Sequence, residues 1–346
     1  MARIIFDIAH PADVHIFKHL IRKILMGGIE VFVTARNKDI TLKLLDEENI
    51  LYKNLGINYS GILGKIKSLV KYDRALFNYA KIIKPDLFIS HSSIYAAHVA
   101  FMLRKKSITL EGTGNIDQSF FYRPFTNIIL TPECVKKNYG KKQIRYKGYD
   151  ELAYLYPGYF SPKPDVLAKL GVNYEEKFVI VRFVARTASH DIGIKGLSFY
   201  DHVKVAEELS QFAKVFITSE RPLPSKLQPF KLKIPYSEIH HAIYYASLVF
   251  GESSTMSSEA AVLGTPSVFL DKIGRYYTRE QEEKYGLVFN FTRNQYDLDK
   301  ALEKAKEILT SPHSREYWRE KSKKLIEDSI SLTDFMFDLV ISELKK

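Results

Sequence analysis

Short apolar runs alternate with segments of helical periodicity along this sequence, and the alternation comes in two series. In the first series we expect strands at 3–8, 30–35, 86–91 and 107–112. The intervening segments, such as 14–26 and 62–84, have the apolar spacing of helices. Strands that alternate with helices indicate a parallel sheet with helices on both faces. Right-handed crossovers then predict a doubly wound, Rossmann-like domain.

The alternation is interrupted once and then resumes. The segment 147–164 contains three prolines and several tyrosines, which is typical of a connection between domains. After it, strands are expected at 177–185, 215–219, 247–251 and 266–271, again with helices between them. The sequence therefore predicts an α/β protein with two Rossmann-like domains. The boundaries that we expect are an N-terminal domain at 1–150, a linker at 151–164, a second domain at 165–328, and a terminal helix at 329–346 that is a candidate to pack on the first domain.

Charge and composition limit the classes of partner. The chain has 51 basic and 40 acidic residues, a formal net charge of +11. This excess favours an anionic partner, although a proteome that is basic throughout would give the same value. One cysteine, Cys134, excludes an internal disulfide framework and a cysteine-based zinc cluster. The N-terminal segment is typical of a first strand and not of a signal peptide, and no run is apolar enough to span a membrane, so a cytoplasmic protein is expected.

Polar residues follow the strands of the first series, at the edge where open parallel sheets bind ligands. His10, Asp13 and Glu111 are candidate general bases, because a carboxylate or an imidazole at such an edge can accept a proton from a bound group. His10 has the alternative of capping the loop, and Asp13 the alternative of capping a helix that starts at Val14. His91 and Ser92 are candidate substrate contacts, with helix capping as the alternative role of His91.

The second series has its own polar loops. Arg186 and His190 are candidate donors to phosphate groups, and surface salt bridges are the equally weighted alternative. Ser219 and Glu220, after the strand at 215–219, are further candidate substrate contacts.

The most specific pattern is GESSTMSSEAAVLGTP, at 251–266. An apolar strand ends at Gly251, small hydroxylated residues form a turn, and a helix begins near Thr255. Gly264 is expected to end this helix. Free N–H groups at a helix start, together with the helix dipole, bind anions. Glu259 lies one turn further on the same face and suits a ribose diol. A Ser/Thr-rich helix cap and a solvated glutamate are the alternative interpretation.

At these residues a resemblance becomes clear. The stretch is similar to the D-S-G-G-x-x-E-E-A-x-x-L-G-x-P motif of UDP-N-acetylglucosamine 2-epimerases and to the S-G-A-x-x-x-x-E-x-x-x-x-G-x-P region of MurG-like glycosyltransferases. Over nearly its whole length the chain resembles an uncharacterised microbial family of GT-B-fold proteins related to these enzymes. The resemblance implies a GT-B-like fold, with two parallel sheets facing a cleft. It also implies that Ser253, Ser254 and Thr255 hold a diphosphate, that Glu259 holds the ribose, and that the nucleobase binds near His240, after a strand expected at 231–235.

Departures from the epimerase pattern affect the reaction. The aspartate of the epimerase G-D-T-T motif is absent here, where the sequence has His91-Ser92-Ser93. Glu111 keeps the glutamate of the H-V-E-A-G-L-R loop without its arginine, and the acid of the P-E-E-x-N-R motif has no counterpart in 123–127. Loss of most of this acid–base set argues against 2-epimerisation by the same mechanism.

The resulting expectation is a metal-independent glycosyltransferase without a cofactor. It transfers a sugar from a nucleotide-diphosphate sugar, with UDP expected as the nucleotide, to a glycan or lipid-linked acceptor. The first alternative is an epimerase or hydrolase of nucleotide sugars, and the second is a non-catalytic protein that binds a nucleotide sugar or nucleic acid. Nucleic acid is disfavoured because no recognised binding module is present.

Two short patterns could suggest a metal site, but neither has the geometry of one. Asp297-Leu298-Asp299 is similar to a D-x-D motif, but it opens a helix, where acidic residues compensate the helix dipole. His240 and His241 are adjacent and would point in different directions on a helix, so they are not expected to bind one metal ion together.

The basic amphipathic segment 62–84 and the basic run 136–147 make peripheral contact with a membrane a hypothesis. Packing of 62–84 on the sheet is the alternative.

Overall fold

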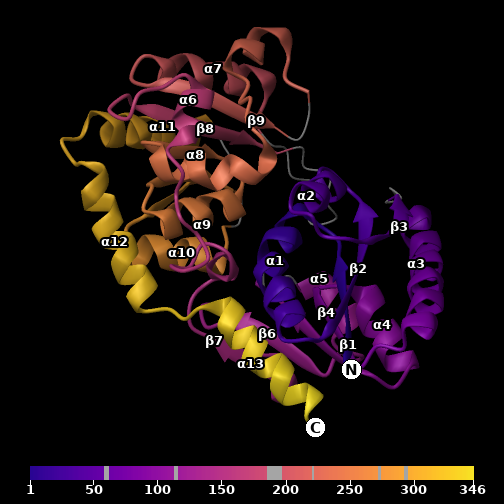
Figure 1. Ribbon diagram of the computed structural model, residues 1–346. Coiled ribbons are helices and arrows are strands. Elements are labelled where there is room, and N and C mark those ends of the chain that lie inside the picture. The colour runs from indigo at the N-terminus through magenta and orange to yellow at the C-terminus, as the bar shows by residue number, and fades with distance from the viewer. Residues whose placement is uncertain (58–61, 113–115, 185–196, 220–221, 272–273, 292–294) are drawn as a thin grey trace. The chain divides into compact units, whose positions relative to one another are not determined.

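The computed structural model divides the chain into two units, Met1–Tyr159 with Ser329–Lys346, and Phe160–Asp328 (Figure 1). It describes residues 1–57, 62–112, 116–184, 197–219, 222–271, 274–291 and 295–346, of which 62–68, 116–118 and 295–296 are described by their backbone alone. In the described part, no helix is both long and apolar enough to cross a bilayer.

A seven-stranded parallel sheet forms the centre of the first unit, in the order β3-β2-β1-β4-β5-β6-β7. Its strands are β1 (Arg3–Ile8), β2 (Glu30–Asn37), β3 (Lys53–Ile57), β4 (Leu87–His91), β5 (Lys106–Leu110), β6 (Ile128–Pro132) and β7 (Gln143–Tyr146). The strand order reverses between β1 and β4, where Asp7 lies opposite Ser90. In doubly wound sheets this reversal is the point at which ligands bind.

The helices of the first unit cover the sheet. They are α1 (Pro11–Met26), α2 (Thr41–Glu47), α3 (Ile62–Ile83), α4 (Ile94–Met102), α5 (Ile116–Tyr122) and α13 (Leu332–Leu344). Short 3-10 turns, η1 (Gly140–Lys142) and η2 (Asp150–Ala153), lie near β7 in the sequence. The C-terminal helix α13 returns to this unit, where Asp334 pairs with Lys23 of α1.

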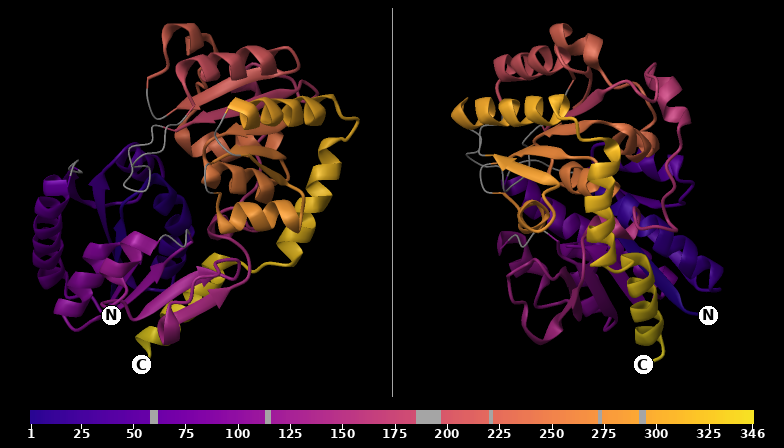
Figure 2. Two further views of the ribbon diagram at one scale, coloured as in Figure 1. Left: turned by 180° about the vertical axis from the view of Figure 1, so that it is seen from behind. Right: turned by 90° about the vertical axis from the view of Figure 1, so that its left-hand side faces the viewer.

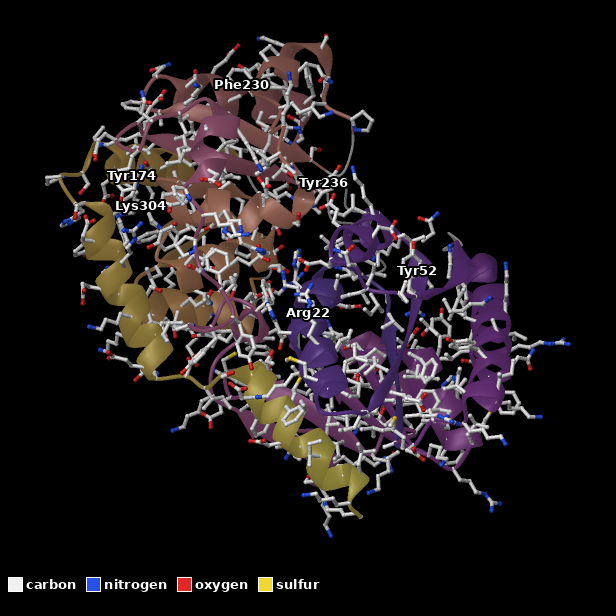
Figure 3. All side chains as sticks on the ribbon, in the orientation of Figure 1. Arg22, Tyr52, Tyr174, Phe230, Tyr236 and Lys304 are labelled. Carbon is white, nitrogen blue, oxygen red and sulfur yellow. The ribbon has the colours of Figure 1, made fainter. Side chains whose placement is uncertain are left out.

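The helix α1 shows why these segments fold locally. Val14, Phe17 and Ile24 recur at helical spacing and are buried, which seats the helix on the sheet. On its polar side Arg22, labelled in Figure 3, reaches Glu48 at 2.8 Å. Pro11 opens the helix, since its fixed backbone angle suits the first helical position.

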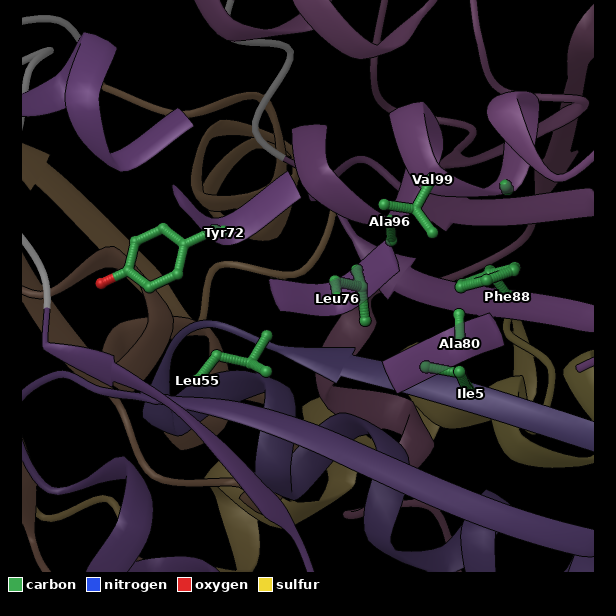
Figure 4. Packing of buried hydrophobic residues seen from close by; sticks show 9 residues of the cluster. Ile5, Leu55, Tyr72, Leu76, Ala80, Phe88, Ala96 and Val99 are labelled. Atoms are coloured by element: carbon green, nitrogen blue, oxygen red, sulfur yellow. The ribbon is translucent and has the colours of Figure 1, made fainter. Parts of the chain in front are cut away.

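The apolar side of α3 packs inside the first unit. Tyr72, Leu76 and Ala80 are fully buried, in a core cluster with Ile5 of β1 and Phe88 of β4 (Figure 4). Val70, which the sequence pattern groups with the apolar face, is instead 66% exposed. The structure therefore supports the alternative in which 62–84 packs on the sheet. The placing of Val70 on the buried face was wrong.

A second parallel sheet forms the centre of the other unit, in the order β12-β11-β10-β8-β9 (Figure 2). Its strands are β8 (Phe178–Phe183), β9 (Lys214–Ser219), β10 (Leu248–Gly251), β11 (Ser267–Leu270) and β12 (Val288–Phe291). Its helices are α6 (Asp165–Leu170), α7 (Phe199–Ser210), α8 (Ile239–Tyr245), α9 (Ser254–Leu263), α10 (Tyr276–Glu283), α11 (Gln295–Thr310) and α12 (Arg315–Glu327). This order reverses between β8 and β10. Two parallel α/β units confirm the predicted fold class.

Several elements differ from the sequence prediction. The short strands β3, β6, β7 and β12 were not predicted, because their four or five residues mix apolar and polar side chains. Residues 231–235 were interpreted as a strand but form only an isolated bridge between Lys231 and Ile217. Prolines at 229 and 235 flank this segment and lack the N–H group that a longer ladder needs.

Candidate functional site

The reversal point of the first sheet brings Asp13 and His91 together. Asp13 is in the first turn of α1, directly after β1, and His91 is the last residue of β4. Asp13 Oδ1 lies 3.0 Å from His91 Nδ1, and Asp13 Oδ2 accepts hydrogen bonds from the backbone N–H groups of Ala9 and His10. The carboxylate of Asp13 is 3% exposed. Residues 78 positions apart thus form one buried pair.

The helix cap of α1 is His10 and not Asp13, which corrects the alternative role considered for Asp13. His10 Nδ1 accepts a hydrogen bond from the N–H of Ala12 at 3.2 Å, and Asp13 completes a capping box. A neutral imidazole that accepts at Nδ1 carries its proton on Nε2. The exposed ring of His10 therefore offers an N–H donor in this arrangement, which confirms its alternative role as a cap, while its role as a base stays a prediction.

His91 is surrounded by carboxylates. Burial disfavours its charged form, but the hydrogen bond that His91 donates to Asp13 and the negative charges of Asp13, Asp150 and Glu111 outweigh this and raise the pKa of His91 to about 9. The imidazole of His91 is thus an imidazolium at neutral pH. In return, the hydrogen bond and charge of His91 hold the pKa of Asp13 below its ordinary value, although burial acts in the opposite direction.

Asp150 is a member of this cluster that the sequence analysis missed. Asp150 Oδ2 lies 3.7 Å from His91 Nε2, and Asp150 Oδ1 accepts a hydrogen bond from the hydroxyl of Tyr146. Burial raises the pKa of Asp150. A Cβ atom added to Gly112 would lie 2.1 Å from Asp150 Oδ2, so this position after β5 must be glycine for the carboxylate to keep its place. Asp150 is in the turn η2, and only the fold brings it to β4.

Glu111 follows β5 and is 1% exposed. Its Oε2 accepts hydrogen bonds from the hydroxyls of Tyr122 and Ser92, the latter at 3.0 Å. Ser92 has a φ of +53°, a left-handed conformation that turns the chain after β4. Glu111, Ser92, His91 and Asp13 are therefore gathered at the carboxyl ends of neighbouring strands, as the sequence predicts for parallel strands.

A buried ionic network supports this edge. Asp7 of β1 pairs with Arg36 of β2 at 2.9 Å and accepts hydrogen bonds from Thr34 and Ser93. The side chains of Asp7 and Arg36 are 0% and 3% exposed. Ser93 is also the N-cap of α4, where it accepts from the N–H of Ala96. The network therefore ties the start of α4, next to His91, to the first two strands.

In the second unit, the backbones of β8 and β10 lie very close together at the point where the strand order reverses. Gly251, at the end of β10, pairs with Arg182 of β8 and has a φ of +148°. A Cβ atom there would lie 2.2 Å from the carbonyl oxygen of Arg182. Arg182 donates to the hydroxyl of Thr218 in β9 at 3.1 Å, which is the partner that its place in an apolar strand requires.

The turn after Gly251 leads directly into α9. Ser253 is the N-cap, and its Oγ accepts a hydrogen bond from the N–H of Met256 at 3.3 Å. Ser253, Ser254 and Thr255 are half-buried, so the turn is not enclosed in the core. The first N–H groups of a helix lie outside the helical ladder, which leaves those of Ser254 and Thr255 directed out of the helix end. Gly264 ends α9 in the left-handed conformation, as predicted.

Glu259 is buried and is not the solvated glutamate of the alternative interpretation. Its Oε1 lies 2.9 Å from Nε2 of His240, and the two side chains are 7% and 4% exposed. His240 is thus in contact with Glu259, and binding of the nucleobase near His240 stays a prediction. His241, next in α8, stacks on Phe160 with ring centroids 5.0 Å apart. The adjacent histidines therefore point in different directions, as the sequence analysis expected.

Glu252 is a further residue that the sequence analysis missed. It is 4% exposed, and its carboxylate accepts hydrogen bonds from the N–H groups of Val184 and Leu197, each at 3.2 Å. It therefore holds both flanks of the loop after β8. Ser219 is half-buried at the end of β9. The predicted contacts Arg186, His190 and Glu220 lie outside the described residues.

The described residues give no metal-binding geometry. Among them, no three histidine, cysteine, aspartate or glutamate side chains are grouped to hold an ion. Asp297 is in the first turn of α11, as expected, and Asp299 pairs with Lys204 at 2.5 Å.

Comparison with known proteins agrees with this architecture. The family model described as "Protein of unknown function (DUF354)" matches residues 2–345. The chain is 23% identical over 273 residues to the uncharacterized protein MJ0665 of Methanocaldococcus jannaschii, which covers 76% of this chain and 80% of that protein.

Solved structures show the same fold at low sequence identity. UDP-GlcNAc 2-epimerase from Neisseria meningitidis bound to UDP-GlcNAc has a TM-score of 0.74 at 15% identity, over 99% of this chain and 100% of that one. The MnaA–UDP structure from S. aureus has a TM-score of 0.72 at 14% identity, over 100% and 96%. The spinosyn forosaminyltransferase SpnP has a TM-score of 0.65 at 12% identity, over 99% of each chain. The fold is therefore GT-B-like.

Proposed function

Since this chain belongs to the family described as Protein of unknown function (DUF354) and has a GT-B-like fold, we propose that it is a glycosyltransferase. Its substrate is a nucleotide-diphosphate sugar, with UDP as the nucleotide, and its acceptor is a glycan or a lipid-linked sugar. The observation that carries the proposal is the accessible start of α9 with the buried Glu259–His240 pair one turn behind it.

In this proposal the second unit binds the nucleotide. The N–H groups of Ser254 and Thr255 and the hydroxyl of Ser253 bind the diphosphate, with the helix dipole adding to the attraction. Glu259 accepts hydrogen bonds from the ribose hydroxyls. His240 is a positioning residue, because it touches Glu259 and fixes the direction of that carboxylate. Stabilisation of the leaving diphosphate by oriented N–H groups is the part of the chemistry that these residues supply.

The first unit supplies the acid–base chemistry. Among its clustered carboxylates, Asp150 is 14% exposed, compared with 3% for Asp13. Its raised pKa also makes it a stronger base than an ordinary aspartate. We assign to Asp150 the removal of the proton from the acceptor hydroxyl, while Asp13 and Glu111 keep His91 charged beside it. The acceptor oxygen then bonds to the anomeric carbon as the bond from that carbon to the diphosphate breaks, and the nucleotide diphosphate leaves with the electron pair.

An epimerase or hydrolase of nucleotide sugars is the second candidate. It is favoured by the similarity of the fold to structures of UDP-GlcNAc 2-epimerases. Product analysis separates the two candidates. Consumption of the nucleotide sugar that depends on an added acceptor supports the transferase, whereas a new isomer or a free sugar without acceptor supports the alternative.

Binding is tested by calorimetric titration of UDP and of UDP-sugars. A ligand that binds the native state also raises its melting temperature. We expect the wild type to bind and Glu259→Gln to bind at least about tenfold more weakly, the scale of one lost charge-assisted hydrogen bond. Glu320→Gln, an exposed glutamate of α12, is the matched control and should bind as the wild type does. Equal affinity of the two variants would contradict the role of Glu259.

A further inference from the structure

Exposed large apolar side chains, three of them aromatic, lie at the end of α4 and on α5 of the first unit. Phe101 and Met102, at the end of α4, are 60% and 51% exposed. Phe120 and Phe121, in α5, are 77% and 53% exposed. Large apolar side chains that cluster on a surface mark an interaction site, whereas single ones do not. We call Phe101, Met102, Phe120 and Phe121 the aromatic patch.

Contacts link the two helices that carry the patch. The ring of Phe101 lies 5.2 Å from that of Phe125, which in turn lies 4.7 Å from the ring of His98. His98 Nε2 is 3.1 Å from the backbone carbonyl oxygen of Phe121, and the rings of Phe120 and Phe121 are 6.0 Å apart. Half-buried His98 and Phe125 thus hold α4 against the end of α5, which keeps the exposed residues of both helices in one region of the surface.

Cationic side chains follow both helices at the edge of the patch. Arg104 is exposed two residues after α4, and Arg123 is exposed directly after α5. A Cβ atom added to Gly140 would lie 3.8 Å from Arg123 Nη2, which places exposed Lys141 next to this arginine. Lys142 donates to the carbonyl oxygens of Arg123 and Pro124. The nearby acids Asp73 and Asp86 are paired with His98 and Lys105.

We propose that the aromatic patch and its cationic edge dock this protein on a bilayer that contains anionic lipids. Aromatic rings suit the interface between headgroups and acyl chains, and each exposed ring gains free energy when it leaves water. Arginine and lysine at the edge are attracted to the negative surface. This combination of exposed rings with exposed arginine and lysine side chains favours a membrane over a second copy of the chain, whose own patch would carry the same cationic side chains.

This surface shares Lys141 and Lys142 with the basic run 136–147 that the sequence suggested, but it does not include the segment 62–84. The apolar side of α3 is in the core, and three of the six basic residues in 136–147 hydrogen-bond within the first unit, namely Lys137, Lys142 and Arg145. The inference does not rest on the proposed transferase activity. It deepens that proposal where the acceptor is lipid-linked, since docking would hold the first unit at the surface that contains the acceptor.

Cosedimentation with vesicles tests the inference. The full chain is mixed with vesicles of phosphatidylcholine alone and of phosphatidylcholine with phosphatidylglycerol. We expect binding to the anionic vesicles, decreasing with added salt. Two double variants should each weaken binding to the anionic vesicles by about tenfold or more: Phe120→Ser/Phe121→Ser and Arg123→Glu/Lys141→Glu. The first removes rings that become buried on binding, of which a single one contributes about 2 kcal/mol, and the second removes attraction to the negative surface.

Matched controls come from the second unit. Phe199→Ser/Tyr200→Ser removes two aromatic rings that are 52% and 75% exposed, and Lys231→Glu/Lys233→Glu makes the same change of charge at exposed positions. Both controls should bind vesicles as the wild type does. Circular dichroism shows whether each variant folds, and UDP titration reports on the nucleotide site separately.

Three results would overturn the inference. The first is a wild type that does not bind anionic vesicles, and the second is an equal loss of binding in the control variants. The third is a wild-type dimer in light scattering that becomes a monomer on Phe120→Ser/Phe121→Ser without vesicle binding, which would assign the patch to contact between copies. Loss of vesicle binding with UDP affinity unchanged would support docking even if the transferase proposal fails.

Discussion

His91 Nδ1 lies 3.0 Å from Asp13 Oδ1, which joins the end of β4 to the helix that follows β1. This pair lies where the strand order of the first sheet reverses, and its charges are set by each other. His91 also faces Asp150 at 3.7 Å, so one imidazolium balances part of the negative charge of the cluster. The charge of His91 therefore depends on this contact and on the carboxylates around it.

The first prediction concerns the titration of His91. Its pKa of about 9 should appear as one histidine whose ring signals titrate well above the others in an NMR pH titration. Asp13→Asn should lower that pKa, because it removes the hydrogen bond and the charge that favour the imidazolium. Asp73→Asn, which removes the partner of His98 in the same unit, is the control and should leave the pKa of His91 unchanged.

The same shift makes a prediction for stability. The pKa of His91 is raised in the folded state, so its contribution is fully present below the unfolded value near 6.5 and is lost as pH rises through about 9. The free energy of unfolding of the wild type should thus fall over this range more than that of Asp13→Asn. Parallel curves for the two proteins in urea denaturation would contradict the pairing.

The second prediction concerns Gly251. Gly251→Ala introduces a methyl group 2.2 Å from the carbonyl oxygen of Arg182 and should cost about 4 kcal/mol or more, since backbone atoms of β8 must move. Gly28→Ala is the control, because Gly28 also has a positive φ, of +76°, but nothing lies within 4 Å of the added atom. It should cost about 1 kcal/mol. Similar midpoints of urea denaturation would rule out the close approach of β10 to β8.

The third prediction concerns the buried pair of the second unit. His240→Ala leaves the carboxylate of Glu259 without its imidazole partner and should destabilise the fold by about 3 kcal/mol. His241→Ala, one residue on in α8, removes a half-buried ring that stacks on Phe160 and accepts a hydrogen bond from the N–H of Lys163 at 3.3 Å, and it should cost less than half as much. Denaturation of both variants by urea measures the difference. Equal losses would mean that the pair contributes nothing specific.

The fourth prediction concerns Asp150. If it removes the acceptor proton, Asp150→Asn should lower kcat by about 100-fold or more with little change in UDP affinity. Gly112→Ala should have a similar effect, because the added methyl group must displace the carboxylate of Asp150. Asp165→Asn, an exposed aspartate at the start of α6, should retain activity. Unchanged kcat in Asp150→Asn would remove this residue from the mechanism.

Apolar periodicity and the glycine and proline residues between elements predicted the repeated strand–helix order, the end of β10 at Gly251 and the end of α9 at Gly264. These features depend on neighbouring residues, so a local pattern contains them. Glu111, His91 and Asp13 were likewise found as polar residues after apolar strands, since parallel strands end at a common edge. The alternative role of Asp13 as a helix cap was wrong, because the cap of α1 is His10.

Other features were decided by tertiary structure alone. Asp150 lies in a turn that no strand pattern predicts, and it reaches His91 only because η2 folds back toward β4. The close approach of Gly112 to the carboxylate of Asp150 likewise appears only in the folded chain. The pairing of His240 with Glu259, 19 residues apart, depends on how α8 packs beside α9. Sequence determines which backbone each segment favours, because propensity is local. The charge of His91 and the burial of Glu259 arise from residues far apart in the chain, so the fold decides them.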